Sequence, residues 1–127
     1  MSVESTRKTD GLAFEITSHE FKLVSDVASS LGGKGSAPDP HDYLEIALAA
    51  CTAITIQMVA NRKGIPLESS DVKIKITEEG TINKILREIT FRGDLTLEQK
   101  DYLLSIAEKC PIHKFLSAGA KIESRLI

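Results

Sequence analysis

A long apolar stretch at residues 46–60 sets the strongest limit on what this chain can fold into. Between Glu45 and Ala60 the polar residues are Glu45, Thr52, Thr55 and Gln57. With Gly64 suited to a C-cap and Pro66 beyond it, the pattern predicts a helix over residues 42–63. A helix that is apolar nearly all round must be buried nearly all round.

The length of the chain decides how such a helix can be covered. With 127 residues, we expect one domain over residues 1–127. A domain of this size buries a limited fraction of its surface, so it can hardly wrap the helix alone. We therefore expect a homodimer whose central helices share one core. The alternative is a monomer in which one sheet and one other helix cover the central helix.

The remaining elements are predicted from alternation, turn residues and capping signals. Thr96 with Gln99 has the form of a capping box, and Pro111 suits the first turn of a new helix after Cys110. The predicted strands are 12–16, 20–26, 72–76, 82–93 and 120–127, and the later helices are 97–110 and 111–116. This order, ββ–α–ββ–α–β, indicates an α+β fold with antiparallel sheets packed on a central buried helix.

Charge and composition exclude several kinds of partner. Sixteen Lys and Arg against eighteen Asp and Glu leave a net charge of −2, which gives no electrostatic case for nucleic acid. The stretch 46–60 is shorter than the roughly 20 residues of a membrane span and contains polar side chains, so no membrane association is expected. The first residues lack the apolar region of a secretory signal, which favours a cytoplasmic location.

The chain has two cysteines, Cys51 and Cys110. In a reducing compartment such a pair is more often catalytic, redox-active or buried than a structural disulfide. Cys51 falls inside the central helix, where it is either a small core residue or a reactive thiol. A mid-helix thiol receives no help from its own helix N-terminus, so activation is expected from a nearby cation or base. Cys110 lies at a helix boundary, and the two can pair if their Cα atoms lie within about 7 Å.

Other chemistries have weaker support. Cys110 and His113, with Cys51 and His41, could form a Cys2His2 metal site, but the spacing of a zinc finger is absent. The glycines at residues 32–40 do not match a phosphate-binding loop, and no Gly-x-Ser-x-Gly motif of a serine hydrolase occurs.

Two segments together carry a resemblance to a known family. One is residues 35–53, which contains Ala47-Leu48-Ala49-Ala50-Cys51-Thr52, and the other begins Cys110-Pro111-Ile112-His113. The pair resembles the OsmC/Ohr family of osmotically inducible and organic hydroperoxide resistance proteins. The resemblance implies an OsmC-like fold in an intertwined homodimer with active sites at the interface. It also implies a peroxidase that reduces organic hydroperoxides without metal or organic cofactor. Cys51 would form a sulfenic acid, Cys110 would resolve it as a disulfide, and a dithiol would reduce that disulfide.

The chain departs from the peroxidase pattern at the residue that normally supports the thiolate. Family peroxidases place a Glu after a Pro, ten residues before the reactive Cys, whereas this chain has His41 after Pro40, followed by Asp42 and Glu45. That Glu holds an arginine from the N-terminal region, for which Arg7 is the candidate here. The alternative is therefore an OsmC-like protein that binds small molecules or senses redox state without efficient peroxidase activity.

Overall fold

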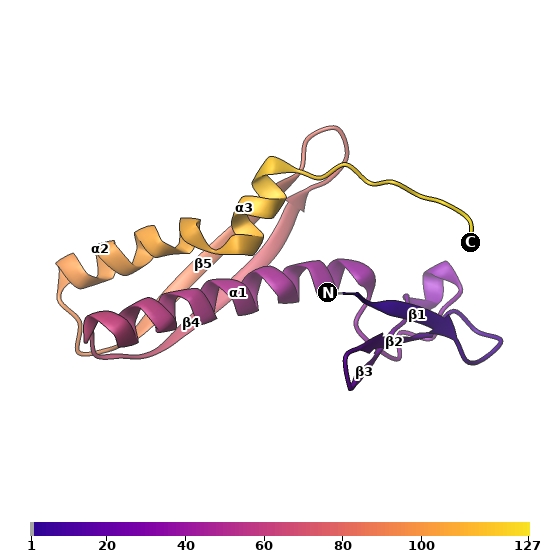
Figure 1. Cartoon of the computed structure of the whole chain (residues 1–127), viewed down its shortest axis with the longest axis horizontal. Coiled ribbons are helices and arrows are strands. Elements are labelled where there is room, and N and C mark those ends of the chain that lie inside the picture. The colour runs from indigo at the N-terminus through magenta and orange to yellow at the C-terminus, as the bar shows by residue number, and fades with distance from the viewer. Residues whose placement is uncertain (1) are drawn as a thin grey trace. The chain divides into compact units, whose positions relative to one another are not determined.

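The computed structural model describes residues 2–127, which form an α+β fold (Figure 1). The chain divides into two compact units, one ending at Leu44 and the other starting at Glu45. The expectation of one domain over the whole chain stays a prediction.

The first unit is built on a three-stranded antiparallel sheet. Its strands β1 (Glu4–Arg7), β2 (Phe14–Ser18) and β3 (Phe21–Ser25) lie in the order β1-β2-β3. The tight turn between β2 and β3 places His19 at a positive φ of 55°. The two strands expected here are confirmed. Strand β1 was not expected, because its polar sequence does not alternate and its strand geometry comes from pairing with β2.

The loop after β3 is organised around the carboxylate of Asp26, which is only 2 % exposed. This carboxylate accepts hydrogen bonds from the backbone N–H groups of Val27, Lys34 and Ser36 and from the Ser36 hydroxyl. The hydroxyl, followed by the backbone donors, lowers the pKa of Asp26 to about 2. Gly33 is required here because a Cβ would lie 2.1 Å from the Val27 carbonyl oxygen and 2.7 Å from Asp26 Oδ1.

The second unit packs helices on a long hairpin (Figure 1). Helix α1 (Pro40–Lys63) starts in the first unit and continues here, followed by β4 (Leu67–Glu78) and β5 (Lys84–Gly93). Helix α2 (Leu97–Ile106), a 3₁₀ turn (Ala107–Lys109) and α3 (Pro111–Ala118) complete it. The capping box of Thr96 and Gln99 is present, and Gly64 ends α1 at a φ of 68°. The core joins α1, β4, α2 and the 3₁₀ turn through Ile56, Val59, Ala60, Leu67, Leu103, Ile106 and Ala107.

Within a single chain, burial of α1 is one-sided, and the expected burial nearly all round in a homodimer stays a prediction. Leu48, Thr52, Ile56, Val59 and Ala60 are buried. On another face Ile46, Ile54 and Met58 are 49 %, 59 % and 61 % exposed, and Ala50 between them is exposed as well. One sheet and the α2–α3 segment therefore cover only part of the helix within this chain. By length and hydropathy alone α1 could also cross a membrane, a criterion that core helices of soluble proteins meet too.

The expected last strand at residues 120–127 is not present. This segment has no regular secondary structure, and the side chains of Ile122, Leu126 and Ile127 are almost fully exposed. A strand exists only when its backbone groups pair with a neighbouring edge, and alternation alone does not supply that neighbour.

Candidate functional site: the Cys51–Cys110 thiol pair

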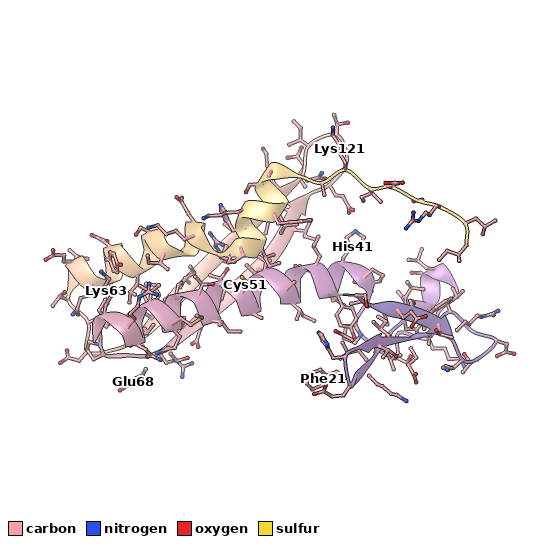
Figure 2. All side chains as sticks on the ribbon, in the orientation of Figure 1. Phe21, His41, Cys51, Lys63, Glu68 and Lys121 are labelled. Atoms are coloured by element: carbon pink, nitrogen blue, oxygen red, sulfur yellow. The ribbon has the colours of Figure 1, made fainter. Side chains whose placement is uncertain are left out.

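The second unit brings the two cysteines together. Cys51 lies midway along α1, where the joint between α2 and α3 passes over it (Figure 2). Cys110 forms that joint as the N-cap residue of α3, and its sulfur accepts a hydrogen bond from the backbone N–H of His113 at 3.4 Å. Both thiols are free; Cys51 is half-buried and Cys110 is 0 % exposed. Cys51 is thus the more accessible sulfur of the pair.

Hydrogen-bond donors surround the Cys51 sulfur. Burial opposes its ionisation, but hydrogen bonds from the Cys110 thiol, the Ile112 backbone N–H and the Thr55 hydroxyl outweigh burial and lower the pKa of Cys51. The Thr55 oxygen lies 3.8 Å from the sulfur, one turn along α1. None of these donors comes from the N-terminus of the helix that carries Cys51, and no cation or base is among them. The backbone donor comes from the N-terminus of α3, which Pro111 opens beside Cys51.

Cys110 has the opposite electrostatic environment. Burial, followed by the hydrogen bond that it donates to Cys51, raises the pKa of Cys110. Of the two thiols, Cys51 therefore ionises more readily, and Cys110 keeps its proton more firmly. A thiolate is the nucleophilic form of cysteine, so this arrangement favours Cys51 as the reactive sulfur.

An arginine on β5 joins the two cysteine-bearing helices. Arg87 donates one hydrogen bond to Thr52 Oγ1 at 3.2 Å, and its Nη2 lies 3.1 Å from Nδ1 of His113. Thr52 directly follows Cys51, and His113 stands three residues after Cys110. Sequence reasoning missed Arg87, although a signal was present. It shares the inward face of β5 with Ile89 and Phe91, where the alternating pattern calls for an apolar residue.

The expected accessory residues lie near the start of the chain and of α1. The Arg7 guanidinium donates to the backbone carbonyls of Asp10 and Gly11, at the β1–β2 turn. The backbone N–H of Asp42 donates to the Asp39 carboxylate at 2.8 Å, and the backbone N–H of Asp39 donates to the Asp42 carboxylate at 2.9 Å. This reciprocal pair caps the start of α1. His41 is exposed in the first turn of α1, and Glu45 is half-buried one turn further on. Their expected roles beside Cys51 stay predictions.

No metal-binding cluster is found in the part of the chain that the structure describes. Among residues 2–127, no three His, Cys, Asp or Glu side chains are grouped so as to hold a metal ion. Nδ1 of His113, one of the donors considered for a metal site, instead lies beside Arg87.

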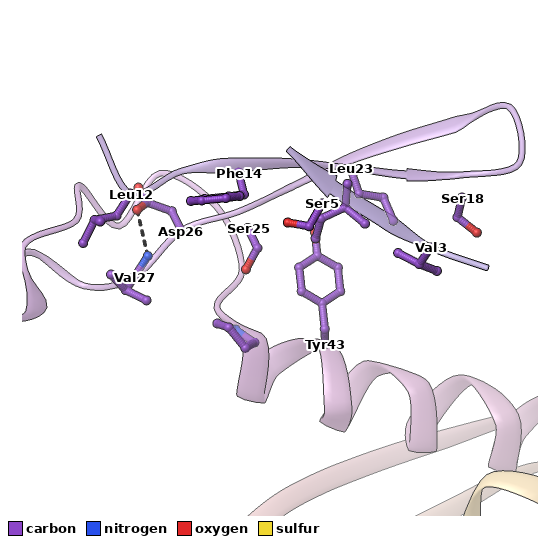
Figure 3. Close-up of a pocket in the computed structure, with 12 residues that line it drawn as sticks. Val3, Ser5, Leu12, Phe14, Ser18, Leu23, Ser25, Asp26, Val27 and Tyr43 are labelled. Carbon is purple, nitrogen blue, oxygen red and sulfur yellow. Dashed lines mark hydrogen bonds between the residues drawn. The ribbon is translucent and has the colours of Figure 1, made fainter. Parts of the chain in front are cut away.

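The first unit contains an apolar pocket of about 540 Å³ (Figure 3). Phe14 and Leu23 line it from the sheet, and Tyr43 lines it from the first turns of α1. The Tyr43 hydroxyl donates to the Val24 carbonyl at 2.6 Å, which fixes the ring against the sheet. The other lining residues are Val3, Ser5, Leu12, Ile16, Ser18, Ser25, Asp26, Val27 and Pro40.

Solved structures with the same fold come from several bacteria. A protein of Psychrobacter arcticus, described as a putative osmotic stress induced and detoxification response protein, is 20 % identical with a TM-score of 0.77, covering 90 % of this chain and 86 % of its own. An organic hydroperoxide resistance protein OsmC of Legionella pneumophila is 28 % identical with a TM-score of 0.62, covering 89 % and 85 %.

A putative organic hydroperoxide resistance protein of Vibrio cholerae, solved with captopril in one of its active sites, is 20 % identical with a TM-score of 0.61, covering 87 % and 82 %. Among curated proteins, none matches the sequence. The family model described as OsmC-like protein matches residues 33–125, a span that includes both cysteines and Arg87. The chain therefore belongs to the OsmC-like protein family.

Proposed function

We propose that this chain is a cysteine-dependent peroxidase that reduces organic hydroperoxides. The observation that carries the proposal is the asymmetry of the thiol pair: an accessible Cys51 with a lowered pKa, hydrogen-bonded by a buried Cys110 with a raised pKa. A peroxidase of this kind needs one thiolate to attack and one protonated thiol held next to it. The relatives from Legionella pneumophila and Vibrio cholerae, described as organic hydroperoxide resistance proteins, support the choice of substrate class.

The reaction has three steps. The Cys51 thiolate attacks one oxygen of the O–O bond, which gives Cys51 sulfenic acid and releases the alkoxide, protonated to the alcohol. The Cys110 sulfur then attacks the sulfenic sulfur, and water leaves as the Cys51–Cys110 disulfide forms. A dithiol finally attacks the disulfide and is itself oxidised, which restores both thiols. We place these steps in the cytoplasm, where dithiol reductants are supplied.

The test is a mass and free-thiol measurement before and after one equivalent of an organic hydroperoxide such as cumene hydroperoxide. We expect wild-type protein to lose two hydrogens as the disulfide forms. Cys110→Ser protein should gain one oxygen at Cys51, which a dimedone probe traps as a sulfenic acid. Cys51→Ser protein should show neither change.

The outcome that contradicts the peroxidase is equally clear. If wild-type protein and Cys110→Ser protein keep all thiols over minutes while a general oxidant such as diamide still closes the disulfide, Cys51 is not activated toward peroxides. Oxidation that starts at Cys110 in the Cys51→Ser variant would reverse the assigned roles.

A homodimer is the second part of the proposal. Ile46, Ala50, Ile54 and Met58 recur every four residues, so they form one exposed apolar stripe along α1. The exposed Ile122 and Leu126 add further apolar surface without a partner in the chain. We propose that a second copy covers these surfaces. Sedimentation at micromolar concentration should then give twice the 13.8 kDa of one chain, and Ile54→Glu should shift the protein to monomer.

The apolar pocket of the first unit supports a second candidate function, the binding of an apolar small molecule. Its volume of about 540 Å³ falls in the range of ligand sites, which are mostly apolar with a few polar groups. This candidate predicts an apolar compound retained through purification and thiols that do not react with peroxide. Native mass spectrometry followed by organic extraction distinguishes it from the peroxidase.

A further inference from the structure

We infer that Arg87 is a positioning residue that clamps helices α1 and α3 together, so that Cys110 stays against Cys51 and the contact is kept when the two sulfurs form a disulfide. Its guanidinium bridges Thr52, next to Cys51, and His113, in the first turn after Cys110. The inference rests on the proposed function, because the clamp would serve the step in which Cys110 forms the disulfide with Cys51. The effect of the clamp on disulfide formation between Cys51 and Cys110 can be measured without any peroxide.

Helix α3 has few side chains packed in the core, so a directed contact at its first turn matters. It is only eight residues long, and none of its side chains is fully buried. Isolated helices of this length are marginal in water, and packing normally supplies their stability. A hydrogen bond from a charged donor on β5 to His113 therefore adds a directed anchor to α3, next to the buried Cys110 at its start.

The position of Arg87 in the sheet argues against an incidental surface arginine. Its strand partner is Ile74, and both lie on the half-buried face of the hairpin. Arg92, on the same strand, is instead exposed and forms a salt bridge with Asp71. For Arg87, no salt bridge is found among residues 2–127. Placing a guanidinium half-buried beside neutral partners costs free energy of desolvation. The feature that offsets this cost is the pair of directed hydrogen bonds to Thr52 and His113.

The clamp depends on the protonation state of His113. An arginine can only donate, so Nδ1 of His113 must accept, which requires a neutral ring with its proton on Nε2. A protonated ring has an N–H at Nδ1 and cannot accept, so protonation releases the clamp.

The experiment measures how readily Cys51 and Cys110 pair, using equilibrium with reduced and oxidised dithiothreitol at neutral pH. Formation of the protein disulfide reduces oxidised dithiothreitol, so electrons balance without a peroxide. Arg87→Gln should lower the equilibrium constant for disulfide formation about tenfold, equivalent to about 1.4 kcal/mol. Arg92→Gln, the matched control on the same strand, should leave it unchanged. Equal constants for the Arg87 and Arg92 variants overturn the clamp.

Two histidine variants test the clamp from its other end, and they serve if Arg87→Gln does not fold. His113→Asn keeps an acceptor oxygen near the Nδ1 position without titrating, so it should retain the wild-type constant. His113→Leu offers no acceptor and should match Arg87→Gln. If His113→Leu behaves like wild type, the contact with Arg87 does not position Cys110 and the inference fails. The peroxidase proposal is judged separately, by sulfenic acid formation in the Cys110→Ser protein, a step in which the clamp has no part.

Discussion

Asp26 in the first unit and Cys51 in the second are both acidic side chains held by hydrogen-bond donors from a turn or a helix start. Asp26 accepts three backbone N–H bonds and one hydroxyl bond, and its carboxylate is inaccessible. Cys51 has one backbone donor, one hydroxyl and one thiol, and it stays half-exposed. In both cases the donors lower the pKa. The difference shows that Asp26 is saturated with donors and enclosed, which suits it to anchoring a loop, whereas Cys51 has fewer donors and keeps an accessible side.

The largest effect should come from displacing the loop that encloses the Asp26 carboxylate. Gly33→Ala places a Cβ 2.1 Å from the Val27 carbonyl oxygen and 2.7 Å from the Asp26 carboxylate, so the loop must shift. We expect a loss of about 2 to 3 kcal/mol in the free energy of unfolding, measured with urea. Gly35→Ala is the matched control, because its Cβ meets open space and only the φ of 58° opposes it. That variant should lose about 1 kcal/mol, and equal losses would show that the enclosure is unimportant.

A smaller effect should follow from titrating Asp26. Its folded pKa of about 2 lies below the roughly 3.9 of an unfolded aspartate, so the unfolded state binds more protons between these values. The contribution to stability is therefore complete above about pH 4 and is lost as the pH falls toward 2. Urea unfolding measured from pH 5 to pH 2 gives the free energy of unfolding at each pH. This free energy should fall less steeply with falling pH in Asp26→Asn than in the wild type. Ser36→Ala, which removes the hydroxyl donor, should give an intermediate slope, and a wild-type slope in Asp26→Asn would contradict the assignment.

The smallest effects concern the donors at Cys51. Cys110→Ala removes the thiol donor, so the pKa of Cys51 should rise and its alkylation by iodoacetamide at pH 7 should slow. Cys110→Ser keeps a donor and should stay closer to wild type, with the rate followed by mass spectrometry. Thr55→Val removes the longer 3.8 Å contact and should slow alkylation less than Cys110→Ala does. Faster alkylation in Cys110→Ala would show that the thiol shields Cys51 more than it activates it.

The elements that follow from local chemistry were predicted from the sequence. The capping box at Thr96, the joint at Cys110 and Pro111, and the hairpin 72–93 depend on residues near one another in the chain. Strand β1 and the unpaired segment 120–127 were mispredicted for a shared reason. Whether a segment is a strand depends on an available edge, and an edge is a tertiary feature.

The site was predicted only in part for the same reason. Both cysteines were recognised, but the source of activation at Cys51 was sought in a cation or base rather than in the start of α3. No spacing in the sequence shows that Ile112 faces Cys51 across sixty residues of chain. Arg87 was detectable as a charged residue on the apolar side of β5, yet its partners Thr52 and His113 become adjacent only after folding.

Pro111 at the first position of α3 has a consequence for spectroscopy. Proline has no amide proton, so the first amide signal of this helix in a ¹⁵N-correlated NMR spectrum belongs to Ile112. That amide donates to the Cys51 sulfur, and the amide of His113 donates to Cys110. Two neighbouring resonances thus report on the two sulfurs separately, which allows the ionisation of one and the oxidation of both to be followed without a chemical label.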